Sequence, residues 1–317
     1  MKTKHPFRIS PVYWSLLIFV FAQLILFVVI IRENTFLNQA QIYVPTQPDE
    51  IITLWPQTTI APSGQVTETP AYSSLGPILI YFFAVVVVLG VVLFIVPVTT
   101  IKLILKGLFA FLFAWGIFII LVMWLPLAAA IAIALAVGLG WFFFPRIWLH
   151  NIALTLALVG VGAVFGRFIS PWTSMILLAV LAIYDFLAVR FGYMLWMAKK
   201  LSDTNTLPAF IIPRSLSDWK YSLKPSSVAR IAETIPAERK YSILGGGDIG
   251  FPLVLTASVY FSRGLPGAII IAIFTITGLA AAYWIQATFL KGKPIPALPP
   301  IAVVSLVGLV IVTTIFL

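Results

Sequence analysis

The chain of 317 residues contains no cysteine and only two histidines. The lack of cysteine excludes disulfides, thiolate metal sites and cysteine nucleophiles. The two histidines, His5 and His150, lie far apart in the sequence and do not have the spacing of metal ligands. We therefore expect no metal site and no cofactor.

Charge is also scarce, because only 9% of the residues are charged whereas 61% are hydrophobic. A soluble globular protein needs far more charge on its surface. The apolar runs are continuous, without the alternation that is typical of membrane β-barrels. The composition therefore predicts an all-α polytopic membrane protein, embedded in the lipid bilayer.

Nine apolar runs predict nine transmembrane helices, since a helix of about 20 residues crosses a bilayer. The first run, at about 13–31, is too long for the apolar part of a signal peptide and lacks a cleavage site, so we interpret it as a retained anchor. We expect residues 1–191 to form helices 1–6, residues 192–242 to form a polar loop, and residues 243–317 to form helices 7–9 of the same membrane domain. The remaining runs lie at about 76–98, 107–126, 127–144, 148–168, 171–191, 243–262, 266–287 and 295–317.

The basic residues divide unequally between the two sides of this arrangement. Only Arg32, Arg167 and Arg263 of the twenty Lys and Arg fall on one side, and all the others fall on the opposite side. Basic residues collect in cytoplasmic loops. The division predicts a multi-pass protein of the cell membrane with a cytoplasmic N-terminus and 192–242 loop, and an external 33–75 loop and C-terminus. The net charge of +10 is explained by these loops, so we expect no nucleic-acid partner.

Two aspartates, Asp185 and Asp248, are the only acidic residues inside the predicted spans. A carboxylate at the centre of a bilayer costs roughly 2.5–3.5 kcal/mol on insertion scales, so its presence indicates a function. At a rise of about 1.5 Å per residue, Asp185 lies about 9 Å and Asp248 about 8 Å inside the cytoplasmic ends of their spans. Pro296-Ala297-Leu298 begins about 5 Å inside the last span by the same measure. The similar depths predict that the three segments meet at one site.

Two carboxylates close together can hydrolyse an amide without a metal ion. Their repulsion in a medium of low dielectric keeps one of them protonated. The ionised aspartate takes a proton from a water molecule that attacks the carbonyl, while the protonated one donates to the carbonyl oxygen. Either aspartate can be the ionised one, with the other protonated.

Glycine and proline next to these aspartates indicate irregular backbone that lines the site. Gly245, Gly246 and Gly247 would let a second backbone approach Asp248 closely, and Pro296 leaves a carbonyl without its helical partner. Such backbone is tolerated at membrane depth where it lines a wet cavity. Tyr184 precedes Asp185 and lies about 100° further round the helix, so direct contact between the two side chains is not required.

The segment 241–244 precedes the glycines and alternates in polarity, which allows a short strand. We hypothesise that a substrate is held here as an added β-strand, by main-chain hydrogen bonds. The alternative is an ordinary entry into a helix.

Together these motifs resemble a known family. Tyr184-Asp185, Gly245-x-Gly247-Asp248 and Pro296-Ala297-Leu298, in this order over nine spans, look like the presenilin and signal peptide peptidase superfamily of GxGD intramembrane aspartyl proteases. The resemblance implies that Asp185 and Asp248 are the catalytic pair. It also implies that Pro296-Ala297-Leu298 shapes the site and assists binding of single-span membrane proteins or peptides.

Two details of these motifs point to different branches of the superfamily. The segment Asp185-Phe-Leu-Ala-Val looks presenilin-like, as does the orientation, whereas Asp248-Ile-x-x-Pro252 looks like the peptidase branch. We interpret the mixture as a prokaryotic, archaeal homologue. The 192–242 loop is shorter than in animal presenilins, so self-cleavage and partner subunits are not implied, and the oligomeric state is open.

Two other functions use similar residues. An ion- or proton-coupled transporter could carry its ion on Asp185 and Asp248, with the glycines forming a broken helix. Prepilin peptidases also have a GxGD motif. Pro296-Ala297-Leu298 at the same depth favours the intramembrane protease over both, and the Tyr184-Asp185 motif also argues against a prepilin peptidase.

Overall fold

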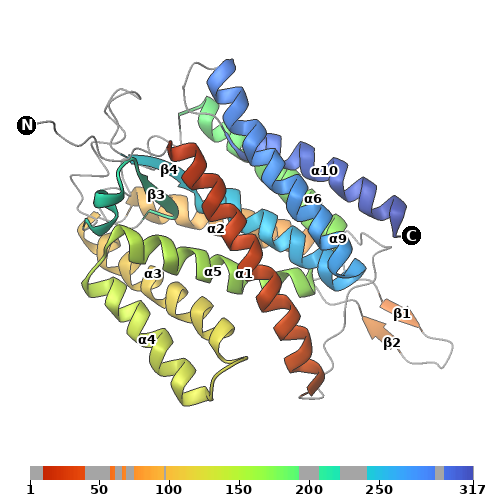
Figure 1. Cartoon of the computed structure of the whole chain (residues 1–317), viewed down its shortest axis with the longest axis horizontal. Coiled ribbons are helices and arrows are strands. Elements are labelled where there is room, and N and C mark those ends of the chain that lie inside the picture. Colours follow the sequence, from red (N-terminus) through yellow and green to blue (C-terminus); the bar gives the residue numbers. More distant parts are fainter. Residues whose placement is uncertain are drawn as a thin grey trace, which may run out of the picture.

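The computed structural model of the chain describes residues 10–39, 58–60, 66–68, 75–95, 98–192, 207–221, 241–289 and 296–316. These residues are mostly helical (Figure 1). The helices are α1 (Pro11–Gln39), α2 (Leu75–Ile95), α3 (Val98–Leu121), α4 (Leu127–Phe143), α5 (Ile147–Phe168), α6 (Pro171–Arg190), α9 (Gly246–Thr288) and α10 (Leu298–Ile315). The strands are β1 (Thr58–Ile60), β2 (Val66–Glu68), β3 (Ala209–Pro213) and β4 (Tyr241–Gly245), and a 3-10 helix, η2, covers Leu216–Lys220.

Seven of the described helices are long and apolar enough to cross a membrane, and α4, with 17 residues, is a shorter apolar helix. The longest of the seven, α9, is two helices joined at Gly264, whose φ of 75° and ψ of −175° are not helical. Glycine adopts this positive φ without the steric penalty that a side chain would bring. Figure 1 shows the two arms of α9 meeting at a corner, from which both lead back toward β3 and β4. The break lies in the gap predicted between the runs at 243–262 and 266–287.

Small residues bring the helices around α9 close together. A Cβ added to Gly166 of α5 would lie 2.3 Å from the Cβ of Ala257, and one added to Gly278 would lie 2.6 Å from the Cα of Ile301 on α10. Such contacts between small residues are the usual way in which membrane helices pack. They hold one arm of α9 against α5 and the other against α10.

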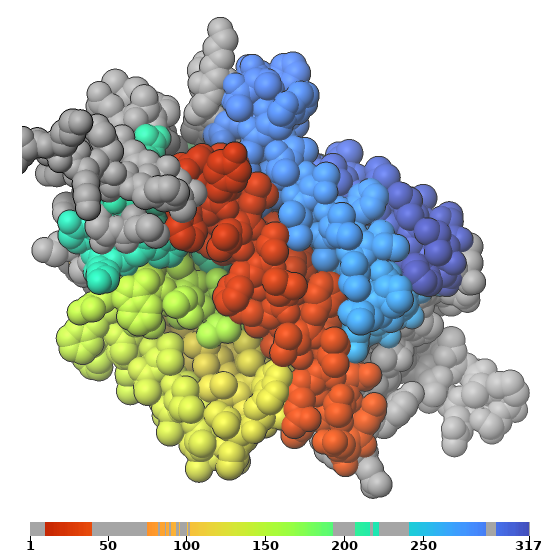
Figure 2. Space-filling view, viewed as in Figure 1, coloured from red at the N-terminus to blue at the C-terminus, as the bar shows by residue number. Residues whose placement is uncertain are grey.

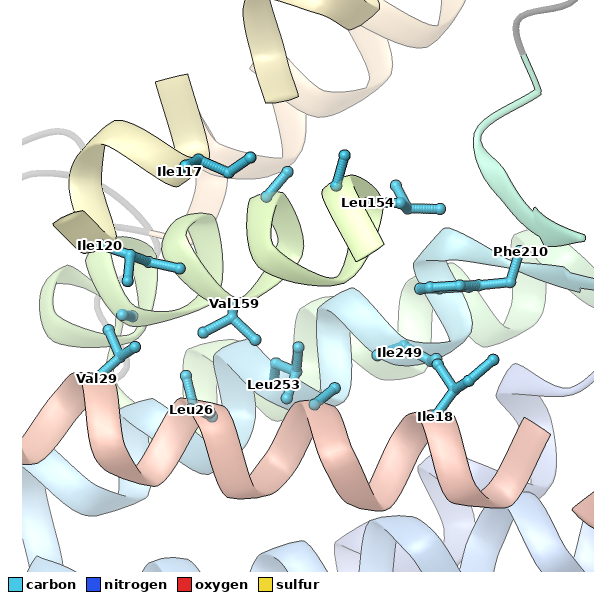
Figure 3. Packing of buried hydrophobic residues seen from close by; sticks show 14 of the residues in the cluster. Ile18, Leu26, Val29, Ile117, Ile120, Leu154, Val159, Phe210, Ile249 and Leu253 are labelled. Carbon is cyan, nitrogen blue, oxygen red and sulfur yellow. The ribbon is translucent and has the colours of Figure 1, made fainter. Parts of the chain in front are cut away.

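The main hydrophobic cluster joins α1, α3, α5, α9 and β3. Figure 3 shows Leu26 of α1, Val159 of α5 and Leu253 of α9 pointing toward one another. In Figure 2, α1 (red) crosses the visible face between α3, α4 and α5 (yellow to green) and the arms of α9 (blue). The first arm of α9 also packs against α6 and α10 in a second cluster, so it lies at the centre of the molecule.

Buried polar contacts link α1 to the helices behind it. The guanidinium of Arg167 at the end of α5 donates to the carboxylate of Glu33 at the end of α1, over 2.9 Å, and both side chains are buried. The face of the same guanidinium lies 4.2 Å from the ring centre of Phe261. Gln23 of α1 donates to Thr275 in the second arm of α9. These contacts fix α1 from its middle to near its carboxyl end.

A two-stranded antiparallel sheet lies at the start of α9. Ile211 of β3 is opposite Ile243 of β4, and Ala209 is opposite Gly245. β3 is buried throughout, with Phe210 in the main cluster (Figure 3). The strand expected over 241–244 is therefore present, whereas β3, inside the stretch predicted as a polar loop, was not predicted.

Candidate active site

Asp185 lies in the last turns of α6 and its side chain is 6% exposed. Its carboxylate accepts a hydrogen bond from the backbone N–H of Leu298, over 3.3 Å, and another from the N–H of Ala297. The first N–H groups of a helix have no partner within that helix, and a negative charge is favoured there. Asp185 therefore caps the start of α10.

The contact with Asp185 explains how the segment Pro296-Ala297-Leu298 contributes to the site. α10 begins at Leu298, so Pro296 and Ala297 precede the helix, whereas the sequence predicted that the segment begins about 5 Å inside the last span. Pro299 and Pro300 stand in the first turn, where proline loses no helical hydrogen bond. The segment thus presents two backbone N–H groups to Asp185.

Asp248 lies in the first turn of α9 and is partly exposed. Its carboxylate accepts a hydrogen bond from the N–H of Gly245. A Cβ on Gly245 would lie 3.0 Å from the carboxylate, and a Cβ on Gly246 would lie 2.9 Å from the carbonyl oxygen of Pro208. A side chain at either of these glycines would therefore crowd the site, whereas a Cβ on Gly247 would only touch the ring of Phe251 at an ordinary distance of 3.4 Å.

The structure brings Asp185 and Asp248 near enough for their carboxylates to interact electrostatically. α6 and α9 pack against each other. The Asp185 carboxylate accepts from N–H groups at the start of α10, and the Asp248 carboxylate accepts from the N–H of Gly245 at the end of β4. The arrangement can keep one carboxyl protonated and the other ionised beside a shared water. Tyr184 is half-buried next to Asp185 on α6.

Tyr283, in the second arm of α9, was not predicted from the sequence to lie near the site. Its hydroxyl is hydrogen-bonded to Ser15 of α1 and lies near Asp248. Only the turn at Gly264 brings the two arms of α9 back to the same side of the molecule, and no pattern in the sequence predicts that pairing.

One edge of β4 faces the carboxylate of Asp248. In an antiparallel ladder, residue pairs alternate between those that bond to each other and those whose N–H and C=O point outward. Asn151 of α5 bonds both the N–H and the C=O of Ile211, so Ile211 and its partner Ile243 are an outward-pointing pair. Gly245 lies two residues further along β4, so its N–H also points away from β3, and it donates to the carboxylate of Asp248.

Ile243 consequently offers an N–H and a C=O on the side of β4 away from β3. Among the described residues, no backbone group pairs with them. The side chain of Ile243 is 39% exposed. This edge can accept a further strand, which would lie beside Asp248.

Metal ligands do not gather in the part of the chain that the structure describes, where no group of three or more His, Cys, Asp or Glu could hold an ion.

Comparisons with known proteins bear on the family and the fold of the chain. The model of the family described as signal-peptide peptidase, presenilin aspartyl protease matches residues 52–316. A solved structure of a presenilin family intramembrane aspartate protease, in space group C222, is 18% identical with a TM-score of 0.60 and covers 96% of this chain and 100% of its own. A second, in space group P2, is 19% identical with a TM-score of 0.54 and covers 95% of this chain and 96% of its own. No curated protein matches the chain.

Proposed function

Because this chain belongs to the signal-peptide peptidase and presenilin family of aspartyl proteases, we propose that Asp185 and Asp248 are its catalytic pair. It is an intramembrane aspartic endopeptidase, and we propose that it cuts the transmembrane segments of single-span proteins. The observation that carries the proposal is the approach of the two carboxylates, with the Leu298 N–H on one and the Gly245 N–H on the other. Nothing in the structure or the comparisons supports a transporter.

The chemistry requires one protonated and one ionised aspartate. The ionised carboxylate removes a proton from water as the water oxygen attacks the scissile carbonyl carbon, and the protonated carboxyl donates to the carbonyl oxygen. The resulting diol collapses as the C–N bond breaks. The carboxyl group that received the water proton gives it to the amine nitrogen, and the other carboxylate takes back a proton from a diol hydroxyl, which leaves the carboxylic acid product. Leu298 and Ala297 hold the Asp185 carboxylate in place by their N–H groups, so the site needs no reorganisation for this step.

The direct test is cleavage of a synthetic single-span peptide by the purified protein in liposomes. We expect two fragments, identified by mass spectrometry, whose new ends lie within the membrane segment. A transporter that used the same aspartates would leave the peptide intact.

We propose nine spans, in which the two arms of α9 count separately and α4 is the ninth. The N-terminus and the 192–242 loop are then cytoplasmic, and the 33–75 loop is external, as the distribution of basic residues predicts. Single cysteines placed at Ser222 and Ser63 of this cysteine-free chain should react with a membrane-impermeant reagent from opposite faces. Labelling of both from one face would contradict the arrangement.

We further propose that the substrate binds as a strand on the free edge of β4. An unwound substrate leaves polar backbone groups that cost several kcal/mol each in lipid unless the enzyme supplies partners. The outward N–H and C=O of Ile243 are such partners, and they lie on the same edge as the contact between Gly245 and Asp248.

Ile243→Pro should remove this edge N–H while leaving the bonds between β3 and β4, which are made by the neighbouring pairs. Proline is tolerated where the N–H faces away from the sheet. We expect kcat/KM for the peptide to fall at least about tenfold, because a hydrogen bond is lost and the ring obstructs the added strand.

The matched control is Ile243→Ala, which keeps the N–H and removes most of the side chain. Its kcat/KM should stay within about threefold of the original, since a partly exposed side chain is lost. Equal losses in the two variants would assign the effect to the side chain and exclude the edge as the binding surface.

A further inference from the structure

Two neighbouring residues of α5, His150 and Asn151, occupy the edge of β3 that faces away from β4. The Nδ2 of Asn151 donates to the carbonyl oxygen of Ile211 over 2.7 Å, and its Oδ1 accepts from the N–H of Ile211 over 3.1 Å. His150 Nε2 is 3.0 Å from the carbonyl oxygen of Ala209. Asn151 thus makes the two bonds that a neighbouring strand would make.

These contacts are buried, so neither side chain can exchange its partner for water. His150 is 0% and Asn151 is 3% exposed, and Ile211 is 2% exposed. Buried polar groups without partners are strongly unfavourable. The His150 ring is also enclosed by Phe113 and Trp141, whose ring centres lie 5.6 Å and 5.9 Å away. β3 is therefore held in one place on α5.

The position of β3 determines the position of β4. The pairing of the strands fixes Ile243 opposite Ile211, and the N–H of Gly246 donates to the carbonyl oxygen of Pro208 just before β3, over 2.9 Å. Gly245, at the end of β4, bonds to Asp248. A continuous set of contacts therefore connects Asn151 to the edge of β4 and to the start of α9.

Asn151 also determines which edge of the sheet is available. With both outward groups of Ile211 occupied, an incoming strand cannot add at that residue of β3. The remaining edge is that of β4, beside Asp248.

We propose that Asn151, supported by His150, is a positioning residue for proteolysis: by clamping β3 to α5 it sets where a substrate strand lies relative to the aspartates, and so which peptide bond is cut. This inference rests on the proposed binding of substrate to β4. Neither residue touches the substrate, and both act through β3. Any displacement of the sheet moves the bound strand along the aspartate pair, because the register of the added strand is fixed by the groups of β4.

The test compares Asn151→Leu, which removes both bonds to Ile211 at similar volume, with a control on the same helix. Thr155→Val is matched, because Thr155 is buried one turn further along α5 and its hydroxyl donates only to the carbonyl of Asn151 within the helix. Purified variants in liposomes are given the single-span peptide, and the fragments are quantified by mass spectrometry.

In Asn151→Leu we expect cleavage to spread to neighbouring bonds and kcat at the original bond to fall about tenfold or more, since small misplacements of a reacting group have effects of this size. KM should change much less than kcat, because the edge of β4 remains. Thr155→Val should keep the original cut position and kcat. A purely structural role would lower cleavage at all bonds in proportion to the folded protein, and unchanged proportions of the products in Asn151→Leu would overturn the proposal.

A second measurement does not depend on catalysis. Hydrogen exchange of the backbone over 241–245 should be faster in Asn151→Leu than in the original protein and unchanged in Thr155→Val. If the leucine variant does not fold, Asn151→Asp, which loses the Nδ2 donor and keeps the acceptor, is measured in the same way. Unchanged exchange over 241–245 would exclude the coupling between Asn151 and β4, even if cleavage is observed. Faster exchange together with no cleavage by the original protein would instead contradict the proposed function.

Discussion

Asp185→Asn and Asp248→Asn should each lower the rate of peptide cleavage by at least about 10⁴-fold, as expected when one member of a catalytic unit is removed. An amide cannot give up or share the proton that passes between the two carboxyl groups. The double variant should be little worse than either single variant, because the residues act together. The rate is measured as fragment release from the single-span peptide in liposomes.

Folding has to be checked in the same variants, because Asp185 also caps α10 through the N–H of Leu298. Asparagine keeps an acceptor oxygen, so thermal unfolding should change far less than catalysis. Asp218→Asn is the matched control, since Asp218 lies on η2 near Tyr241 and outside the spans. It should cleave normally, and full activity of either site variant would remove that aspartate from the mechanism.

Arg167→Leu should destabilise the protein by about 3–5 kcal/mol, because it leaves the Glu33 carboxylate buried without its partner. The two side chains are only 6% and 9% exposed and are joined by a hydrogen bond of 2.9 Å. The substitution also removes the contact with Phe261. The measurement is thermal unfolding in detergent.

The informative comparison is with the double variant Glu33→Leu/Arg167→Leu. A buried ion pair replaced by apolar residues is often neutral, so the double variant should regain most of the stability lost in Arg167→Leu. If the double variant is as unstable as the single one, the loss comes from packing against Phe261 rather than from the unpaired carboxylate.

Most of the helices could be located from the sequence, because a helix that crosses the bilayer needs an apolar run of about 20 residues. The bounds of two were wrong: α3 begins at Val98, nine residues before the run predicted at 107–126, and α1 extends to Gln39, inside the predicted 33–75 loop. The predicted runs at 148–168 and 171–191 differ by one residue at one end from α5 and α6. From their depths the three motifs were predicted to meet. Leu298 does bond to Asp185 across 113 residues of sequence, although Pro296 and Ala297 precede α10 instead of lying inside the last span.

The sheet of β3 and β4, and the attachment of β3 to Asn151, were harder to predict. The apolar run of β3 is flanked by Pro208 and Pro213, which is a weak strand signal, but a run this short inside a polar stretch does not reveal its partner. Asn151 looks like a polar residue near the end of a span, and its role depends on Ile211, which is 60 residues away. Such pairings arise only from the tertiary arrangement.

The direction of β4 has a consequence for the polarity of substrates. β4 leads directly into α9, so in the proposed arrangement of spans its carboxyl end points into the bilayer. A strand that adds antiparallel, as β3 does on the other side, must run out of the bilayer, with the amino-terminal part of the substrate still in the membrane. In the proposed orientation this is a protein whose amino terminus is external and whose carboxyl terminus is cytoplasmic. A substrate inserted the opposite way would have to pair in parallel, which is slightly less stable per residue. We therefore expect a preference for one insertion polarity that is independent of side-chain sequence.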